Sequence, residues 1–260
     1  MNNELEQKYI DVINNNVNVG KSSALGEFSI LIAGLIGLCF VLFLFADNIS
    51  SFLIDKMSNK TQIKLEKYLP NPKFETKNEP SEKIKLLEEI KPYIISLDKN
   101  LQNKSEFKIY ETPQKEVNAF VTPNGTIFFT EGLLNKVEKE ETLAFILAHE
   151  MGHYAHRDHL KSISRELVLA IIKTIITFGQ QDLNTVVGGI SSINDLSHSR
   201  KQEEQADKYA VKVLVNLYGD TKGAEEFFEL LEKESEVPEL FYYFSTHPST
   251  KQRLKSIKNR

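Results

Sequence analysis

The stretch from Phe28 to Ala46, FSILIAGLIGLCFVLFLFA, contains nineteen residues and no charged side chain. At a rise of ~1.5 Å per residue, a helix of this length measures roughly 28 Å, close to the ~30 Å hydrocarbon core of a bilayer. A core helix of a soluble domain seldom lacks polar residues for so long. A cleaved signal peptide also fits poorly, because mixed polar residues precede the run and no small-residue cleavage site follows it. We therefore expect a transmembrane helix at 28–46.

Outside this run, the composition is that of an ordinary globular protein. Hydrophobic residues make up 41% of the chain and charged residues 26%, which is enough for a sizeable core without disulfides. The formal net charge of −4 leaves no basic surface, so we expect no nucleic acid partner. The single cysteine, Cys39, lies inside the apolar run and cannot form a disulfide within the chain.

The lysines on either side of the apolar run bear on its orientation. Two lysines precede it and four follow it closely: Lys8, Lys21, Lys56, Lys60, Lys64 and Lys67. Because cytoplasmic flanks carry the excess of positive charge, this count favours a cytoplasmic location for the C-terminal side.

The chain divides into four parts with different sequence patterns. We expect a polar N-terminal tail at 1–27, the transmembrane helix at 28–46, a helical linker at 47–74 and one domain at 75–260. Three prolines between positions 70 and 80 mark the break before the domain, because proline interrupts helices.

Within the domain, the hydrophobic period changes twice. It is helical at 82–103, with an interruption or a kink near Pro92. Three short runs rich in β-branched and aromatic residues then predict strands: 107–111, 117–121 and 126–130. The PNG turn at 123–125 predicts an antiparallel hairpin from the last two. Helices follow at 140–157, 161–179, 199–218 with Gly219 as C-cap, 222–235 and 249–259. The sequence therefore predicts an α+β fold, mostly helical with a small antiparallel sheet.

One of these helices contains an apolar run that resembles a second membrane span. The run LVLAIIKTIITF at 167–178 is twelve residues long and contains Lys173. A membrane span needs ~20 residues, so we expect a core helix here.

The stretch ETLAFILAHEMGHYAHRDH at 141–159 contains the motif H-E-x-x-H, formed by His149, Glu150 and His153. Residues four apart share one face of a helix, so both imidazoles can point at the same metal ion. Glu150 can take a proton from water and pass it to a leaving amine. Zn²⁺ suits nitrogen and oxygen ligands and lowers the pKa of a bound water towards ~7. Solvated histidines on a surface helix are the alternative, but the preceding LAFILA favours a buried helix.

Zinc usually has three protein ligands, so one more ligand is needed. The candidates are the downstream acids and the remaining histidines: His156, His159, His198 and His247. In SRKQEEQADKYA at 199–210, Glu203 and Asp207 are spaced four apart on a predicted helix. Glu203 can bind the metal while Asp207 accepts a hydrogen bond from the far nitrogen of a ligand histidine. A solvated charged helix face would show the same spacing, so the spacing alone does not decide between a metal site and a surface helix.

Four ordered motifs resemble those of the zinc metallopeptidase family that contains HtpX and the CAAX prenyl endopeptidases. They are VNAFVTPNGTIFFTEGLL at 117–134, HEMGH at 149–153, SRKQEEQAD at 199–207 and HPSTKQR at 247–253. The family signature is H-E-x-x-H, then S-R-x-x-E-x-x-A-D, then H-P-x-x-x-x-R. The resemblance covers roughly residues 105–255 and implies a zincin-like domain of the gluzincin type.

The resemblance also implies a role for each matched residue. It implies that His149, His153 and Glu203 bind one zinc ion. Glu150 would be the general acid/base, and Asp207 would be the hydrogen-bond partner of a ligand histidine. His247 would be catalytic by stabilising the oxyanion, or would occupy the open zinc position in a resting form; a plain loop histidine is the alternative. Arg253 would be a structural or substrate-contacting cation. Asn118 and Phe120 lie on a predicted edge strand that could pair with an extended substrate backbone.

The function implied is that of a membrane-anchored zinc metalloendopeptidase that hydrolyses protein or peptide substrates in protein quality control. Many members of the family have several spans, whereas this chain has one predicted span, which removes support for a prenylated substrate. Members with soluble domains act outside the cytoplasm, contrary to the lysine count, so the side of the membrane stays open. We expect a single-pass protein of a bacterial inner membrane. The alternatives are a zinc-binding chaperone-like or adaptor protein with little or no turnover, and a metal-free membrane-tethered binding module.

Overall fold

A computed structural model describes most of the chain. The described residues are 3–14, 24–69, 73–103, 106–177 and 198–233, together with Tyr243, His247 and Arg253. The chain forms two compact units, Met1–Leu44 and Phe45–Arg260. The helix expected at 249–259 and the segment 180–197 lie outside the described residues.

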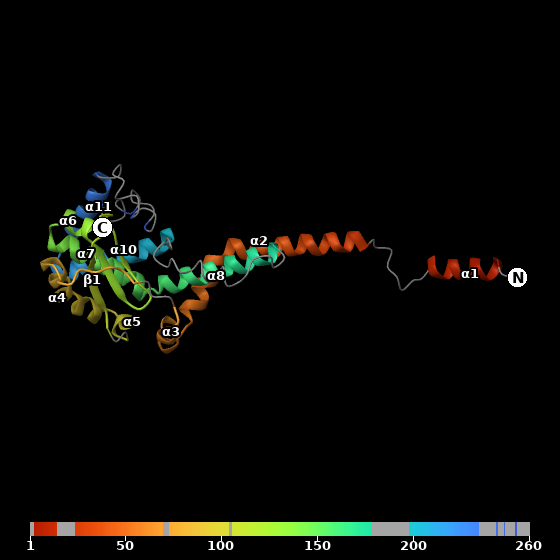
Figure 1. The fold of residues 1–260 in the computed structure, drawn as a ribbon, viewed down its shortest axis with the longest axis horizontal. Helices are drawn as coiled ribbons and strands as arrows, with labels where there is room; N and C mark the ends of the chain where they lie inside the picture. The colour runs from red at the N-terminus through yellow and green to blue at the C-terminus, as the bar shows by residue number, and fades with distance from the viewer. Residues whose placement is uncertain are drawn as a thin grey trace. The chain divides into compact units, whose positions relative to one another are not determined.

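The first unit contains α1 (Asn3–Asn14) and most of α2 (Ala24–Asp55), the long helix in Figure 1. α2 includes the whole apolar run and continues past it. Among the described helices, only its segment Leu25–Asp55 is long and apolar enough to cross a membrane by length and composition, with a mean hydropathy of 2.8. Only 6% of its most apolar window is buried, unlike the core helix of a soluble protein.

Three helices follow α2 in the second unit: α3 (Asn59–Glu66), α4 (Glu82–Leu97) and α5 (Lys99–Gln102). α3 begins after Ser58, whose hydroxyl accepts a hydrogen bond from a backbone N–H of the first turn. Of the interruption or kink expected near Pro92, the structure excludes the interruption, because α4 continues through Pro92. The helix ends instead at Asp98, which adopts an extended conformation and caps α5.

The sheet consists of β1 (Lys108–Thr112), β2 (Ala119–Val121) and β3 (Thr126–Thr130), in the order β1-β3-β2. β2 and β3 pair in antiparallel fashion, which confirms the predicted hairpin. β1 pairs with β3 in parallel, so the sheet is mixed, where an antiparallel sheet was expected. The reason is the central position of β3, four of whose five residues are buried. β2 occupies one side of β3, so β1 pairs on the other side. Because β1 and β3 both run opposite to β2, they run in the same direction and pair in parallel.

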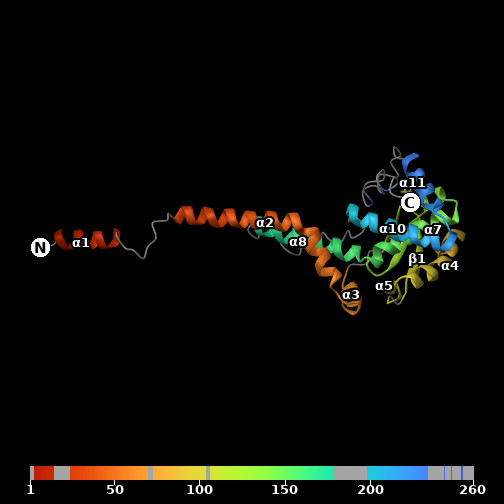
Figure 2. The same ribbon diagram turned by 180° about the vertical axis from the view of Figure 1, so that it is seen from behind.

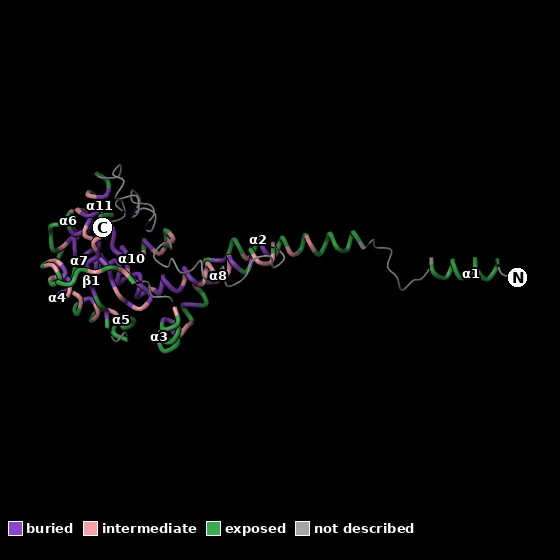
Figure 3. Tube along the Cα trace, viewed as in Figure 1, coloured by how far each residue is buried: buried purple, intermediate pink, exposed green. Residues whose placement is uncertain are grey.

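The second unit is built around α7 (Glu140–Ala155), which packs against α4, β2, α10 (Arg200–Tyr218) and α11 (Lys222–Lys233). Every residue of α7 from Thr142 onward is buried, as the colouring in Figure 3 shows. A helix that is buried on all sides belongs to the interior of a domain. This explains why the H-E-x-x-H motif follows an unbroken apolar run.

The neighbours of α7 have clear boundaries in the sequence. Gly219 ends α10 with φ at 81°, which confirms it as the C-cap. Figures 1 and 2 both show α10 beside α7. α11 approaches the start of α7 at Gly223, where an added Cβ would lie 2.4 Å from the carbonyl oxygen of Glu141. α6 (Glu131–Lys136) follows β3 directly.

α8 (Asp158–Ile176) is only partly the core helix that its apolar run predicts. Ala170 and Ile172 are buried, but Leu167, Ile171 and Ile176 are 40%, 52% and 60% exposed. The described part of this run, 167–177, therefore has one buried face and one apolar face without cover from the described residues. An apolar composition alone could not distinguish this arrangement from a fully buried helix.

Candidate metal centre

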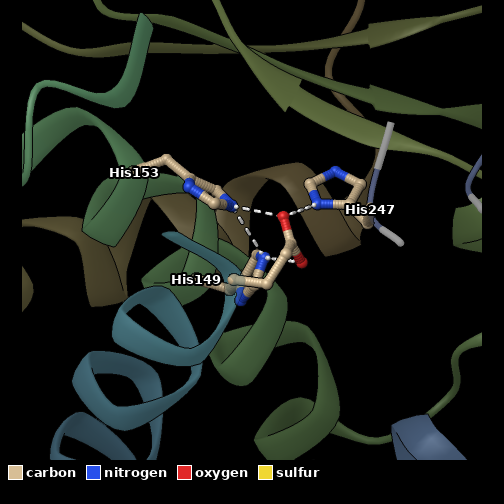
Figure 4. Close-up of side chains that lie close together, drawn as sticks. His149, His153 and His247 are labelled. Atoms are coloured by element: carbon tan, nitrogen blue, oxygen red, sulfur yellow. Dashed lines mark hydrogen bonds and ion pairs between the residues drawn. The ribbon is translucent and has the colours of Figure 1, made fainter. Parts of the chain in front are cut away.

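Two consecutive turns of α7 present the residues of the H-E-x-x-H motif. His149, Glu150 and His153 are almost fully buried, at 2%, 2% and 1% exposure. The four-residue spacing places both imidazoles on one side of the helix, with their Nε2 atoms 3.0 Å apart (Figure 4). The motif thus forms a pair of converging nitrogen atoms inside the domain.

α10 brings a carboxylate to these two imidazoles. Ser199 caps the helix through a capping box, which starts α10 one turn before Glu203. The Oε1 atom of Glu203 lies 3.3 Å from Nε2 of His153, and its Oε2 atom lies 3.7 Å from Nε2 of His149. Glu203 is fully buried, so its negative charge is directed at the histidine pair.

The next turn of α10 brings a second carboxylate behind the first histidine. The Oδ1 atom of Asp207 lies 3.1 Å from Nδ1 of His149. This approach depends on Gly152 of α7, where an added Cβ would lie 3.2 Å from a ring carbon of Tyr209. The glycine within HEMGH therefore allows α10 to come close enough to reach the site.

A tight turn between α7 and α8 supplies the corresponding carboxylate for the second histidine. Arg157 adopts φ of 60°, a left-handed conformation that is costly for any residue except glycine. Its guanidinium donates to the carbonyls of Ile54 and Met57 at 3.0 and 2.6 Å, which holds the turn. The reversal places Oδ2 of the buried Asp158 at 2.8 Å from Nδ1 of His153.

His247 and Arg253 reach the same cluster from the C-terminal part of the chain. The Nδ1 atom of His247 lies 3.0 Å from Oε1 of Glu203, a contact drawn in Figure 4. Arg253 donates from Nε and Nη2 to the two oxygens of Asp207, both at 2.7 Å. Its Nη1 lies 2.6 Å from Oε2 of Glu203. Arg253 is 5% exposed, and its guanidinium is paired with both carboxylates of α10.

The geometry of the cluster fits a metal ion. Carboxylates face Nδ1 of both His149 and His153, so with a metal bound each Nδ1 would carry the proton and each Nε2 would offer a lone pair. Two lone pairs at 3.0 Å repel each other unless a cation lies between them. Around a tetrahedral zinc, ligand atoms at ~2.0–2.1 Å lie ~3.3 Å from one another. The distances here, including those to Glu203, are 3.0, 3.3 and 3.7 Å. With His247, the group offers four ligand atoms within 4.8 Å of one another.

The two histidines have opposite pKa shifts, so in the absence of a metal the positive charge of the pair resides on His153. Burial lowers the pKa of His149 to about 4, against the opposing effect of Asp207, so its imidazole is neutral. Burial would also lower the pKa of His153, but Asp158 and Glu203 outweigh it and raise the pKa to about 10. The site therefore stabilises positive charge.

The two glutamates at the site have opposite pKa shifts. Burial would raise the pKa of Glu203, but His247 and Arg253 hold it well below its ordinary value, so this carboxylate stays ionised. Burial raises the pKa of Glu150, although His247 opposes the shift. Glu203 is therefore suited to bind a cation, and Glu150 to accept and release a proton.

The remaining histidines lie beside the cluster. The ring of His198 stacks on that of His153, with centroids 3.8 Å apart. His159 contacts Glu66 of α3, with Nε2 3.2 Å from Oε1. His156 is the C-cap of α7. None of the three belongs to the group formed with His149, although His198, His153 and Asp158 form a second, overlapping group of possible ligands.

β2 lies at the edge of the sheet next to α7, as expected for the strand that contains Phe120. Asn118 and Thr122, on either side of β2, exchange backbone hydrogen bonds with the chain of β3. Bonded and non-bonded pairs alternate in an antiparallel ladder. The backbone N–H and C=O groups of Ala119 and Val121 therefore face the open edge, and those of Phe120 face β3.

The side chains of Asn118 and Phe120 have different surroundings. The ring of Phe120 packs against Phe74 and Phe128, with centroids 5.0 and 5.2 Å apart, in an aromatic cluster on the sheet. Asn118 is 1% exposed, and neither atom of its side-chain amide has a hydrogen-bond partner. A buried amide without a partner costs about 1–3 kcal/mol, so a group that hydrogen-bonds to Asn118 would offset this cost.

Sequence reasoning missed Asp158 and Arg157. The only signal was an acid five residues after His153, directly after the apolar pattern of the helix ends. A left-handed arginine gives no such signal, because this conformation is typical of glycine. The contact of Glu66 with Tyr154 joins residues far apart in the sequence and could not be foreseen from local patterns.

A buried helix that presents H-E-x-x-H to a carboxylate of a second helix defines a metallopeptidase. The sequence profile of one family, described as Peptidase family M48, matches residues 80–260, and the chain belongs to this family. The match includes every residue of the metal-binding cluster. Membership of this family implies a bound metal, in agreement with the geometry above.

Several curated proteins resemble the chain over this region. The mitochondrial metalloendopeptidase OMA1 of Arabidopsis thaliana is 34% identical over 142 residues, which cover 54% of this chain and 29% of that protein. Protease HtpX of Legionella pneumophila (strain Lens) is 27% identical over 194 residues, covering 58% of this chain and 69% of that protein. Metalloprotease LoiP of Escherichia coli is 27% identical over 163 residues, which cover 59% of this chain and 62% of that protein. The match thus spans about a third of the OMA1 proteins, 29% in Arabidopsis and 35% in cattle.

Proposed function

We propose that this protein is a membrane-anchored zinc metalloendopeptidase that cleaves peptide bonds in proteins or peptides and acts in protein quality control. The observation that carries the proposal is the convergence of His149, His153 and Glu203, whose ligand atoms lie 3.0–3.7 Å apart. Membership of Peptidase family M48 and the names of the relatives, metalloendopeptidase and protease, support the same activity.

We assign one zinc ion to His149, His153 and Glu203. When bound, zinc supplies a Lewis acid that polarises the scissile carbonyl and acidifies water. Glu150 is the general acid/base: its raised pKa suits a group that accepts a proton from water and returns it to the leaving amine. Asp207 holds the proton on Nδ1 of His149, which keeps Nε2 directed at the metal.

His247 lies between a ligand and the general acid/base. Its Nδ1 atom is 3.0 Å from Glu203 and its Nε2 atom is 3.7 Å from Oε1 of Glu150. From this position we propose that His247 donates a hydrogen bond to the oxyanion that develops during attack. Arg253 balances the charges of Glu203 and Asp207 and so acts as a positioning residue.

The substrate backbone is proposed to add to β2 as a further strand. The outward N–H and C=O groups of Ala119 and Val121 supply the hydrogen bonds, so binding is largely independent of substrate sequence. The unpartnered side-chain amide of Asn118 is a further candidate for a backbone contact. Phe120 would support the strand through its aromatic cluster.

For the membrane, we propose a single crossing by residues 28–46, and a bacterial inner membrane as the location. The exposure of the apolar window of α2 supports a lipid environment, and the relatives from Legionella pneumophila and Escherichia coli support a bacterial setting. The corresponding division of the chain is a tail at 1–27, a linker at 47–74 and a peptidase domain at 75–260.

The test is casein hydrolysis by the full-length protein in detergent with one equivalent of zinc, beside its Glu150→Gln variant. The variant should keep one zinc per chain and lose activity by at least ~10²-fold, because the proton transfer is removed and the ligands are not. Glu204→Gln is the matched control, since Glu204 is exposed and forms an ion pair with Lys208 on the outside of α10.

The possible outcomes separate an enzyme from a binding protein. Activity in the parent and the control, with zinc but no activity in Glu150→Gln, supports the proposal. Stoichiometric zinc without hydrolysis in any of the three would contradict it and favour a chaperone-like or adaptor protein. A parent that binds no zinc would contradict the metal assignment itself.

A further inference from the structure

A cavity of about 270 Å³ lies between the end of α2 and the first turns of α8 and α10. None of the four residues that converge on the metal position lines it. Its volume is many times the ~30 Å³ of one water molecule in the liquid, so it has room for a small ligand group.

The charges that line this cavity are mostly positive. They come from Lys161, Arg165, Arg200 and one acid, Asp47. Arg165 pairs with Asp47 at 2.9 Å and with Glu166 at 3.1 Å, and Lys161 pairs at 2.9 Å with Asp55; Glu166 and Asp55 lie outside the lining. Arg200 forms no ion pair within the described part of the chain. The cavity therefore retains positive charge that is available to an anion.

Two features add hydrogen-bond donors to this charge. The cavity includes Ser199 and Arg200 at the N-terminus of the nineteen-residue helix α10, where the helix dipole attracts anions and the backbone N–H groups of Arg200 and Lys201 take no part in the capping box. Ser162 is 7% exposed and lines the cavity, and its hydroxyl has no hydrogen-bond partner among the described residues. Because this hydroxyl lies at the cavity wall, it is available to donate a hydrogen bond to an anion there.

We propose that this cavity binds the phosphate group of an anionic ligand. Arg200 and Arg165 supply charge-assisted hydrogen bonds, and Ser162 and the N-terminus of α10 supply neutral ones. A lipid headgroup is the source that the sequence favours, because Asp47 directly follows the apolar run 28–46 and so lies at the depth of the headgroups. The lipid source rests on the proposed membrane span, whereas the affinity for phosphate does not.

An occupant of the cavity would contact the elements that build the metal centre. His198 lines the cavity and stacks on His153, and Ser199 begins the helix that carries Glu203 one turn later. A ligand that orders this turn would therefore order a metal ligand.

The experiment uses the full-length protein in dodecyl maltoside micelles and calorimetric titration with three probes. They are dioctanoyl phosphatidylglycerol, inorganic phosphate, and dioctanoylglycerol, which has no phosphate. Arg200→Gln should weaken binding of a phosphate-bearing probe about tenfold, the usual effect of one charge-assisted hydrogen bond. Lys201→Gln removes the same charge from an exposed neighbour that does not line the cavity, and should change binding less than about twofold.

Each outcome supports or overturns the proposal. Binding of the phospholipid alone, weakened in Arg200→Gln, identifies a headgroup site, and the same dependence for inorganic phosphate identifies free phosphate as the ligand. The proposal is overturned if no phosphate-bearing probe binds, if dioctanoylglycerol binds equally well, or if both variants lose affinity equally. Binding is measured without hydrolysis, so a cavity that binds no phosphate would leave the peptidase proposal intact. Equally, a protein without peptidase activity could still bind phosphate in this cavity.

Discussion

The Oδ2 atom of Asp158 lies 2.8 Å from Nδ1 of His153, and this contact turns the opposite nitrogen of the ring towards the metal position. Asp207 has the same relationship with His149, at 3.1 Å. One carboxylate comes from the turn after α7 and the other from α10, so two separate parts of the fold orient the two imidazoles. A ligand histidine held in this way keeps its proton on the far nitrogen.

Replacing Asp158 with asparagine should weaken zinc binding by about 10–100-fold. The amide has nearly the same size but carries no charge, so it no longer fixes the proton on Nδ1 of His153. Competition with a chromophoric chelator measures the affinity. Asp220→Asn, at an exposed pair with Lys222 after α10, is the control and should leave it unchanged. Equal affinities for Asp158→Asn and the parent would show that His153 needs no such partner.

Removing the guanidinium of Arg253 should destabilise the domain. Arg253→Gln leaves Asp207 and Glu203 buried without their cation, and breaking a buried ion pair costs about 3–5 kcal/mol in the free energy of unfolding. Urea unfolding followed by circular dichroism measures the loss. Arg253→Lys keeps the positive charge but lacks the planar guanidinium that binds two oxygens at once. This variant should therefore recover only part of the lost unfolding free energy. A loss below about 1 kcal/mol in Arg253→Gln would contradict this account.

Val121→Pro should impair substrate binding and leave the fold intact. It removes one outward N–H from the open edge of β2, and edge strands tolerate proline at such positions. We expect kcat/KM for casein to fall roughly 3- to 10-fold, the effect of one backbone hydrogen bond. Phe120→Pro is the contrast: it removes an N–H that faces β3, so it should lower stability first. An unchanged kcat/KM in Val121→Pro would exclude strand addition at β2.

Gly223→Ala should destabilise the contact between α11 and α7. The added Cβ would lie 2.4 Å from the carbonyl oxygen of Glu141, and backbone cannot yield as a flexible side chain does. Overpacking of this kind costs about 1–3 kcal/mol, measured as a shift of the urea midpoint. Gly37→Ala is the control, since a Cβ there meets nothing within 4 Å. If the two variants unfold alike, the close approach of α11 does not depend on Gly223.

Features set by local spacing could be predicted from the sequence. The strand at 126–130 has its expected bounds because β-branched and aromatic residues fill it between clear turn signals. His149 and His153 converge because i, i+4 spacing places side chains on one helix face, whereas the family motif, not the spacing, pointed to Glu203 on the second helix. Gly219 ends α10 because a helix C-terminus favours a residue with positive φ.

Features that depend on distant contacts could not be predicted. The parallel pairing of β1 with β3 follows from which strand occupies the centre of the sheet. The role of Asp158 depends on a left-handed turn at Arg157, which is held by carbonyls at the end of α2. The half-exposed α8 shows the same limit, because an apolar run does not reveal what covers it.

Glu66 connects α3 to the helices around the metal centre. Its carboxylate accepts hydrogen bonds from the hydroxyl of Tyr154 at 2.7 Å and from Gln62 at 2.8 Å, and it lies 3.2 Å from Nε2 of His159. Burial would raise the pKa of Glu66, but His159, Gln62 and Tyr154 together outweigh burial and lower it from 4.5 to about 2. This carboxylate therefore makes folding dependent on pH.

The sign of this dependence follows from the lowered pKa. The folded protein holds Glu66 ionised more strongly than the unfolded chain does, so its contribution is full above pH 4.5 and is lost as the pH falls towards 2. Between pH 5 and 2, the metal-free parent should lose about 3 kcal/mol of unfolding free energy more than Glu66→Gln does. Urea unfolding across this range measures the difference, with Glu82→Gln, an exposed acid on α4, as the control. A difference between parent and variant that stays constant with pH would show that Glu66 is not ionised preferentially in the folded state.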